Sequence, residues 1–430
     1  MVSRDRALVD GASSRSGVVD AALSVPIRAG PLDGCAIAPG ARRGYQQAMA
    51  AIDPVALTQD LIRRPSVTPA DAGAMDIVEA TLRGLGFACR RMRFGEIENL
   101  YARYGTARPN LCFAGHTDVV PVGDAEAWSR EAFAAEIVDG MLIGRGSVDM
   151  KSAVAAFAAA AAKAIAAGEV TGSLSFLITG DEEGVATHGT KMVVDQLAEE
   201  GEAIDHCVVG EPSSAETFGD MIKIGRRGSI NAWITVDGAQ GHVAYPHRAA
   251  NPIPPLVELL HRLQTHVLDD GYTGFQPSNL EVTTIDVANG ATNVIPAQAK
   301  ARLNIRFNPA HKGADLAAWI RAEAEAVNEG FDGRITVEPV ISGEAFLTEP
   351  GPFTEVVAAA VADVAGVAPE LSTTGGTSDA RFIRALCPVV ELGLVGKTMH
   401  MVDERAPVAE IRQLQAVYER LITRYFAAFG

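Results

Sequence analysis

Short apolar runs that alternate with helical segments most constrain how this chain of 430 residues can fold. In chain order the expected elements are helix 70–85, strand 110–114, helix 150–167, strand 173–179, helix 188–199 and strand 205–209. The alternation resumes with helix 353–365, strand 389–394 and helix 408–429. Strands that alternate with helices are typical of a layered fold. The sequence therefore predicts an α/β fold with a largely parallel sheet.

The order of strands and helices changes between these two stretches. The expected elements there are strand 229–236, helix 252–267, strands 280–287 and 300–307, helix 315–329 and strand 334–339. The order β-α-β-β-α-β is that of a split βαβ, ferredoxin-like sandwich. We therefore expect an inserted α+β domain over 225–341, within a discontinuous catalytic domain formed by 50–224 and 342–430.

Residues 1–48 differ from the rest of the chain. They are rich in Gly, Ala, Ser and Arg and show no sustained period. They also lack a continuous apolar core of the kind that a secretory signal needs. We expect a disordered leader, produced by a start codon upstream of Met49. A transit or regulatory arm is the functional alternative.

Composition limits the classes of partner. The net charge of −16 argues against a general binder of nucleic acid or of membrane surfaces, which would carry a basic face. The five cysteines are scattered and odd in number, as expected in a reducing compartment. No apolar stretch has the length of a membrane span. We expect a cytoplasmic protein that handles a small molecule.

Potential ligand residues gather at the ends of the predicted strands. Asp149 directly precedes a helix, and the others, each close to a glycine or in a late loop, are His116, Asp118, Glu182, Glu183, Glu211 and His400. In open α/β sheets, ligands bind beyond the carboxyl ends of the strands. Imidazole together with carboxylate suits zinc or cobalt. Two histidines with three or more carboxylates exceed the needs of one zinc, and two metals that share a carboxylate would use them all.

Each residue alone has an ordinary structural interpretation. Asp149 would serve equally well as a helix N-cap. Glu182 and Glu183 would form a solvated loop pair, and His116 a hydrogen-bonded core residue. Several independent strand ends carry such residues, and this joint arrangement favours a single site.

Several motifs resemble one known family. GHTDVVPVGD (115–124), GRGSVDMKS (144–152), GDEEG (180–184) and GEPSS (210–214) are similar to motifs of the M20 family of dinuclear zinc peptidases and deacylases. GRRGSI (225–230), GHVAYPH (241–247), TNVIPA (292–297) and GGTSDARF (375–382) resemble one amidase branch of that family, which removes a succinyl group from a diamino dicarboxylic acid. The resemblance covers residues 50–430.

The resemblance implies a role for each ligand. His116 and Glu211 would bind one zinc, Glu183 and His400 the other, and Asp149 would bridge two Zn²⁺ per subunit, with Co²⁺ as a substitute. Asp118 would hold the His116 imidazole, Glu182 would be the general base, and a cis peptide would follow Asp149.

The resemblance also implies a substrate pocket and a partner. The candidate substrate-binding residues are Arg226, Tyr245, Asn293, Arg306, Gly376 and Thr377. His242 would donate to the oxyanion of a second subunit, in a homodimer formed through residues 225–341. Two alternatives stay open: another M20 amidase, such as an acetylornithine deacetylase or a carboxypeptidase, and a non-catalytic metal-binding scaffold.

Overall fold

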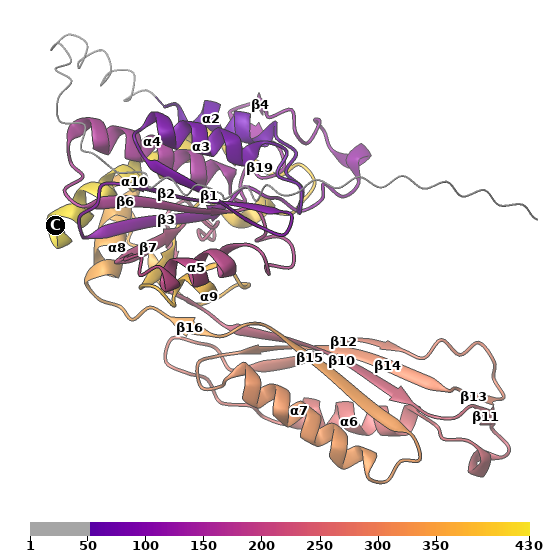
Figure 1. The fold of residues 1–430 in the computed structure, drawn as a ribbon. Helices are drawn as coiled ribbons and strands as arrows, with labels where there is room; N and C mark the ends of the chain where they lie inside the picture. Colours follow the sequence, from indigo (N-terminus) through magenta and orange to yellow (C-terminus); the bar gives the residue numbers. More distant parts are fainter. Residues whose placement is uncertain (1–51) are drawn as a thin grey trace, which may run out of the picture. The chain divides into compact units, whose positions relative to one another are not determined.

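The computed structural model describes residues 52–430, so the predicted leader lies outside the described residues. Its main sheet has eight strands in the order β1-β2-β6-β3-β7-β18-β8-β17 (Figure 1). Their bounds are β1 Ala88–Phe94, β2 Ile97–Tyr104, β3 Asn110–His116, β6 Ser173–Thr179, β7 His206–Val209, β8 Met221–Lys223, β17 Glu370–Ser372 and β18 Val389–Glu391. The neighbours β6, β3, β7 and β18 pair in parallel. Their carboxyl ends therefore meet at one edge of the sheet.

Helices cover both faces of this sheet. Along β3, Leu111 and Phe113 point to one hydrophobic core, and Cys112 and Ala114 to another, because successive side chains alternate across a strand. The first core is closed by α2 (Pro54–Ile62), α3 (Ala74–Gly84), α4 (Lys151–Ala167), α8 (Pro352–Ala365) and α10 (Val408–Phe429). The second core is closed by α5 (Thr190–Glu199) and α9 (Ala380–Ile383). The predicted α/β layer fold is confirmed.

The alanine-rich helix α4 is buried around almost its whole circumference from Ala153 to Ala162. Its small side chains let neighbouring elements approach closely, which is how proteins fill an interior at crystal-like density. Its one aromatic residue, Phe157, stacks on Phe113 of β3 with ring centroids 4.1 Å apart and also contacts Tyr418 of α10. Phe157 therefore joins the central helix to both the sheet and the closing helix.

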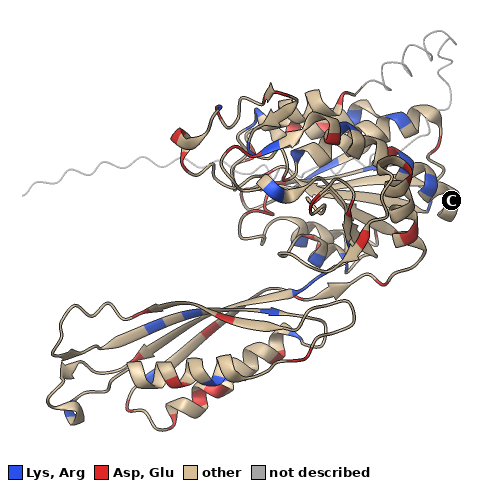
Figure 2. Ribbon diagram, turned by 180° about the vertical axis from the view of Figure 1, so that it is seen from behind, with Lys and Arg blue, Asp and Glu red and all other residues tan. Residues whose placement is uncertain are grey.

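A second sheet has four antiparallel strands in the order β12-β14-β10-β15. Its elements are β10 (Gly228–Asp237), α6 (Ile253–Thr265), β12 (Asn279–Asp286), β14 (Gln298–Phe307), α7 (Gly313–Asn328) and β15 (Arg334–Gly343), which is the predicted β-α-β-β-α-β order. Ile230, Ile234 and Leu303 form a separate core with the helices. Figure 2 shows acidic and basic residues interspersed along α6 and α7.

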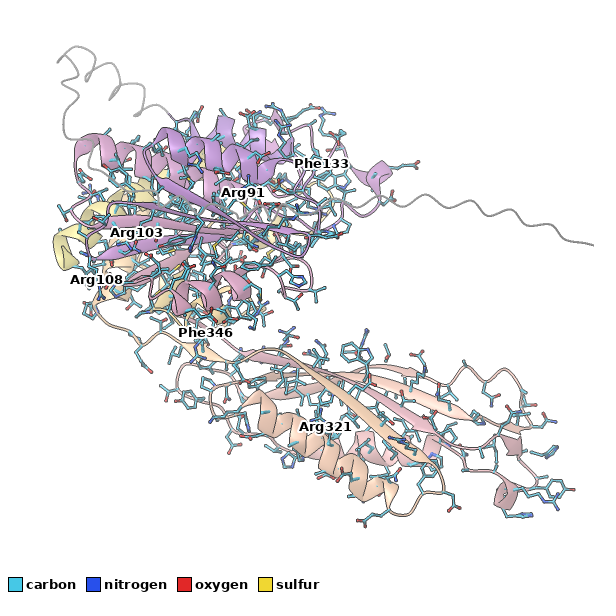
Figure 3. All side chains as sticks on the ribbon, in the orientation of Figure 1. Arg91, Arg103, Arg108, Phe133, Arg321 and Phe346 are labelled. Atoms are coloured by element: carbon cyan, nitrogen blue, oxygen red, sulfur yellow. The ribbon has the colours of Figure 1, made fainter. Side chains whose placement is uncertain are left out.

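Short strand pairs complete the described chain. β9 (Gly225–Arg226) pairs with β16 (Phe346–Leu347) where the chain leaves and re-enters the α/β part, and Phe346 is labelled in Figure 3. The others are β11 (Gly241–His242) with β13 (Val294–Ile295), and β4 (Glu136–Val138) with β5 (Met141–Ile143) and β19 (Arg405–Pro407). Within residues 52–430 no helix is long and apolar enough to cross a bilayer.

The sequence did not predict the hairpin of β1 and β2. β1 is an edge strand that carries three arginines, and one of them, Arg91, pairs with Asp76 and Glu79 of α3. Charged edge strands protect a sheet against unwanted pairing, but they lack the apolar run that identifies a buried strand. β8 and β17, of three residues each, were not predicted either, because neither lies in a long apolar run such as the one around β18. Helix α3 begins at Ala74 and not near residue 70, since the Asp71 carboxylate accepts from the N–H groups of Gly73 and Met75 in a preceding turn.

Phe157→Ala tests the central packing of α4. Removal of a buried aromatic ring leaves a cavity and should lower the free energy of unfolding by about 3–5 kcal/mol. Urea denaturation followed by circular dichroism measures this change, and Phe157→Leu should lose less. An unchanged urea midpoint for the alanine variant would contradict the assigned packing.

Candidate metal centre

The topology brings the predicted ligands together from five parts of the chain. His116 is the last residue of β3, Glu182 and Glu183 follow β6, and Glu211 follows β7. Asp149 lies two residues before α4, and His400 lies in the loop that leads to β19. Because β6, β3 and β7 are parallel neighbours, their carboxyl ends deliver the side chains to one place.

Two glycines allow α4 to start directly against the strand ends. A β-carbon at Gly115 would lie 2.4 Å from Cε of Met150, and one at Gly210 would lie 2.6 Å from the same atom. At Gly210 the β-carbon would also lie 2.6 Å from Cβ of Ala153, which can move only together with α4. The glycines therefore let Asp149, which precedes Met150, lie beside His116.

The first group of ligands is buried. Nε2 of His116 lies 3.2 Å from Oδ1 of Asp149 and 3.8 Å from Oε1 of Glu211. His116 is only 1% exposed. Ligand atoms of these three residues all lie within 4.8 Å of one another, close enough to hold one metal ion.

The second group shares Asp149 with the first. Nε2 of His400 lies 3.3 Å from Oδ2 of Asp149 and 2.9 Å from Oε1 of Glu183. Asp149 thus turns one oxygen to each histidine, which is the arrangement a bridging carboxylate needs. The Asp149–Met150 peptide is cis, as expected. His400 has a side chain 47% exposed and a φ of 63°, a left-handed conformation that is strained for a residue other than glycine and is found at functional sites.

Burial and charge, as well as the distances between the ligand atoms, indicate that these residues can bind a metal. Oε1 of Glu211 is buried and has no hydrogen-bond partner. Burial, followed by the charges of Asp149 and Glu182, raises the pKa of Glu211 well above its usual value. Buried carboxylates that repel one another require protons or cations. A bound cation would satisfy the free oxygen of Glu211 and offset the repulsion.

Asp118 organises the surroundings of His116. Its backbone carbonyl lies 2.9 Å from Nδ1 of His116, while its carboxylate oxygen lies farther away, at 3.7 Å. The carboxylate instead accepts from the Thr68 hydroxyl at 2.6 Å and from the N–H groups of Glu182 and Glu183. If Nδ1 donates to the carbonyl, Nε2 is left with a lone pair for a metal. The imidazole is therefore held by main chain, and the carboxylate fixes the loop of the two glutamates.

Glu182 lies next to the ligands. Its carboxylate comes within 4.8 Å of His116 and Glu183 ligand atoms, so geometry alone also allows it to bind a metal. Burial and then the charge of Asp379 raise the pKa of Glu182 well above its usual value. Cations bound beside it would act in the opposite direction. Glu182 is placed where a carboxylate can exchange a proton with a molecule in the adjacent cavity.

That cavity has a volume of about 1210 Å³. Glu182, Glu183, Glu211 and His400 line it, together with four of the predicted substrate-binding residues, Arg226, Arg306, Gly376 and Thr377. Nε of Arg226 donates to both oxygens of the buried Glu391 at 3.0 Å, and another of its nitrogens donates to the Thr374 carbonyl. Arg306 donates to Asn304 at 3.1 Å.

The structure does not bring three predicted residues into this cavity within their own chain. His242, Tyr245 and Asn293 are absent from its lining, and all three are exposed. They belong to the pairing of β11 with β13 and the loops beside it. Nδ1 of His242 accepts from the N–H of Ala244, and the Asn293 carbonyl accepts from Val243.

Other residues of the cavity were missed by the sequence analysis. Lys223, Asn231 and Asn304 contribute to its wall. Asn231 and Asn304 occupy polar positions of strands β10 and β14 that alternate with buried ones, so period-two alternation was a usable signal. Lys223, on a strand of three residues, had no such signal.

Known proteins are similar to this chain in sequence and in fold. Residues 112–424 match the peptidase family M20/M25/M40. The chain is 78% identical, over 88% of its length and 100% of the relative's, to the succinyl-diaminopimelate desuccinylase of Phenylobacterium zucineum (strain HLK1). It is 73% identical, over 88% of its length and 97% of the relative's, to the enzyme of the same name from Caulobacter vibrioides (strain NA1000 / CB15N).

Two solved structures share the fold at low sequence identity. An M20 family metallo-carboxypeptidase from Sulfolobus solfataricus superposes with a TM-score of 0.74 at 16% identity, covering 87% of this chain and 99% of the other. A dinuclear metal binding peptidase of the M20 family from Bacillus subtilis has a TM-score of 0.66 at 13% identity, covering 90% and 99%. The family match over most of the chain and the high identity to full-length relatives show that the chain belongs to the peptidase family M20/M25/M40.

Proposed function

We propose that this chain hydrolyses the amide bond of N-succinyl-LL-2,6-diaminopimelate and releases succinate and LL-2,6-diaminopimelate. The reaction belongs to the synthesis of lysine and of cell-wall diaminopimelate. Relatives up to 78% identical carry the name succinyl-diaminopimelate desuccinylase, and the match spans nearly their whole length. The observation that carries the proposal is Asp149, whose two oxygens face His116 and His400. Because the four described cysteines are free thiols, we propose the cytoplasm as the compartment.

Two Zn²⁺ ions per subunit are the proposed cofactors, with Co²⁺ as a substitute. His116 and Glu211 would hold one, Glu183 and His400 the other, and Asp149 would touch both. When bound, such ions lower the pKa of water and polarise a carbonyl. The donor set of imidazole and carboxylate suits zinc or cobalt better than magnesium.

The protein's own groups handle protons and charge. Glu182 accepts a proton from the attacking water and returns it to the leaving amine. Arg226 and Arg306, with the backbone at Gly376 and Thr377, face the carboxylates of the substrate across the cavity. Arg226 is held in place by Glu391, which limits the freedom of its guanidinium.

The proposed assembly is a homodimer formed through residues 225–341, with 50–224 and 342–430 as the catalytic domain. β12 is an edge strand of the four-stranded sheet. Ile285 on this strand and Val257 on the neighbouring helix α6 are each 58% exposed, beside a groove of about 520 Å³. An exposed apolar edge strand invites pairing with another chain, and a second copy would cover it symmetrically.

The dimer would also explain where His242 works. β10 begins at Gly228, two residues after Arg226 of the cavity wall, and its ten residues span about 30 Å. His242 lies beyond the far end of β10 and is exposed. We propose that it enters the cavity of the partner subunit and donates to the oxyanion there.

The substrate assignment predicts strong discrimination between acyl groups. Purified protein should cleave the N-succinyl substrate with a kcat/KM about 10⁴-fold above that for the N-acetyl analogue, because the acetyl group lacks the carboxylate for which the arginines of the cavity are matched. Parallel assays of both compounds measure the ratio. A preference for the N-acetyl compound would favour a deacetylase of the same family.

Metal binding should weaken as the pH falls. Burial opposes protonation of His116, but the hydrogen bond and the charge of Asp149 outweigh it and raise its pKa well above the usual value. Hydrogen bonds to Asp149 and Glu183 raise the pKa of His400 to about 10. Both imidazoles are therefore protonated in the metal-free protein at neutral pH and must lose a proton to bind a metal. Between pH 8 and pH 6 the apparent affinity should fall about tenfold per pH unit for each displaced proton.

Calorimetric titration of zinc in buffers of different ionisation enthalpy measures the protons released. Equal affinity at pH 6 and pH 8 would contradict the assigned ligands. Removal of metal by chelation should abolish turnover, and zinc or cobalt should restore it.

Glu182→Gln should keep both metals and the fold but lose about 10²–10⁴-fold in kcat, since a positioned proton acceptor is removed. Elemental analysis, thermal denaturation and steady-state kinetics separate the three effects. Glu183→Gln is the matched control and should lose metal. If Glu182→Gln loses metal instead, the two glutamates have been assigned in the wrong order.

A mixing experiment tests His242 in the partner's site. His242→Ala should lose about 10²–10³-fold in kcat, as expected for an oxyanion donor, and Glu182→Ala should be nearly inactive. After subunit exchange, a mixed dimer has one site with both Glu182 and His242 intact, so activity should rise above that of either parent. A mixture as inactive as its parents would show that His242 acts within its own chain.

A further inference from the structure

Two loops carry the ligands that are not at strand ends. Residues 144–150 carry Asp149, and residues 395–404 carry His400. A buried ion pair joins these loops: one guanidinium nitrogen of Arg145 lies 2.7 Å from Oε2 of Glu404, and their side chains are 2% and 0% exposed. Neither residue touches the cavity.

Glu404 fixes the backbone that leads to Asp149. Its Oε1 accepts from the N–H groups of Val148 at 2.8 Å and of Asp149 itself at 3.1 Å. Its Oε2 accepts from the N–H of Gly146 at 3.1 Å. One carboxylate therefore holds three main-chain donors in the segment that ends at the shared ligand, and such charge-assisted bonds are strong.

Arg145 fixes the backbone around His400. It donates to the Met401 carbonyl at 3.2 Å and to the His400 carbonyl at 3.4 Å. The guanidinium also donates to the Pro121 carbonyl and lies over the ring of Trp128, 5.3 Å from its centroid. Because the guanidinium is a rigid plane, its contacts set the position of the loop in more than one direction.

The two groups of ligands do not depend equally on this pair. His116 and Glu211 lie at or just beyond the ends of parallel strands, which hold them without Arg145 or Glu404. His400 lies in an irregular loop, is half exposed and has a positive φ. The loop conformation of His400 therefore needs support from outside the loop, and Arg145, held by Glu404, supplies it.

We propose that Arg145 and Glu404 are positioning residues that set the affinity of the metal held by Glu183 and His400. The metal held by His116 and Glu211 is affected less, since only its contact with Asp149 is disturbed. This inference rests on the proposed two-metal centre. Loss of a partner that orients ligands reduces metal affinity by about 10–100-fold, so the ratio of the two affinities should widen by that factor.

The test is titration of the metal-free full chain with Co²⁺, followed by its visible absorption and by calorimetry. Glu404→Gln should separate the titration into one tight and one weak step, with altered absorption of the weakly bound ion. Arg145→Gln combined with Glu404→Gln removes both charges and leaves neither buried alone, so it tests the proposal even where the single variant folds poorly. Leu82→Ala, on the buried face of α3 and outside both loops, is the control for loss of stability alone.

The proposal holds if both Glu404 variants widen the ratio of affinities and Leu82→Ala does not. Unchanged affinities, or an equal loss at both steps, would overturn it. Should the unsubstituted protein bind fewer than two ions, the two-metal centre is itself wrong. That result is distinct from failure of the positioning role, which requires two ions in the parent.

Discussion

The repulsion among buried carboxylates at one edge of the sheet governs the rest of this structure. Asp149 and Glu211 are buried and Glu182 and Glu183 half-buried, and burial, followed by the charges of neighbouring carboxylates, raises the pKa values of Glu182 and Glu211. Only protons or cations can relieve this repulsion. Such a cluster lowers the stability of the fold near neutral pH unless positive charge is bound beside it. A bound metal would therefore contribute to folding stability as well as to catalysis.

Parallel pairing makes this cluster possible. Because β6, β3 and β7 all end at the same edge, residues far apart in sequence meet without any long loop to hold them. Glycine at two strand ends then lets the start of α4 lie against the sheet, so that Asp149, two residues before α4, lies between the two histidines. The alanine-rich composition of α4 serves the same purpose along its length, since a bulkier helix would stand farther from β3.

Much of this arrangement was predictable from sequence, and the failures have physical causes. Buried strands such as β3 and β6 are continuous apolar runs that end in polar motifs, so both the strands and their ligands could be recognised. The edge strand β1 is charged and gave no such pattern. The Arg145–Glu404 pair joins residues more than 250 positions apart, and no local pattern marks Glu404. Tyr245 and Asn293 were assigned to the substrate pocket by motif, but neither lines the cavity within its own chain. A motif match assigns a residue to a site but does not show where the fold places its side chain.

The histidines of the two ligand groups also differ in their exposure to solvent, so only one side of the centre is open. His116 is almost fully buried and absent from the cavity lining, whereas half of the His400 side chain is exposed and lines the cavity. A substrate in the cavity therefore meets His400, Glu182 and Glu211 but not His116. The ligand that must tolerate an incoming substrate is on an irregular loop, and the ligand that must stay fixed is at the end of a strand. A metal site needs ligands that are held rigidly and also a side that a substrate can reach. In this fold His116 is the rigidly held histidine and His400 is the accessible one.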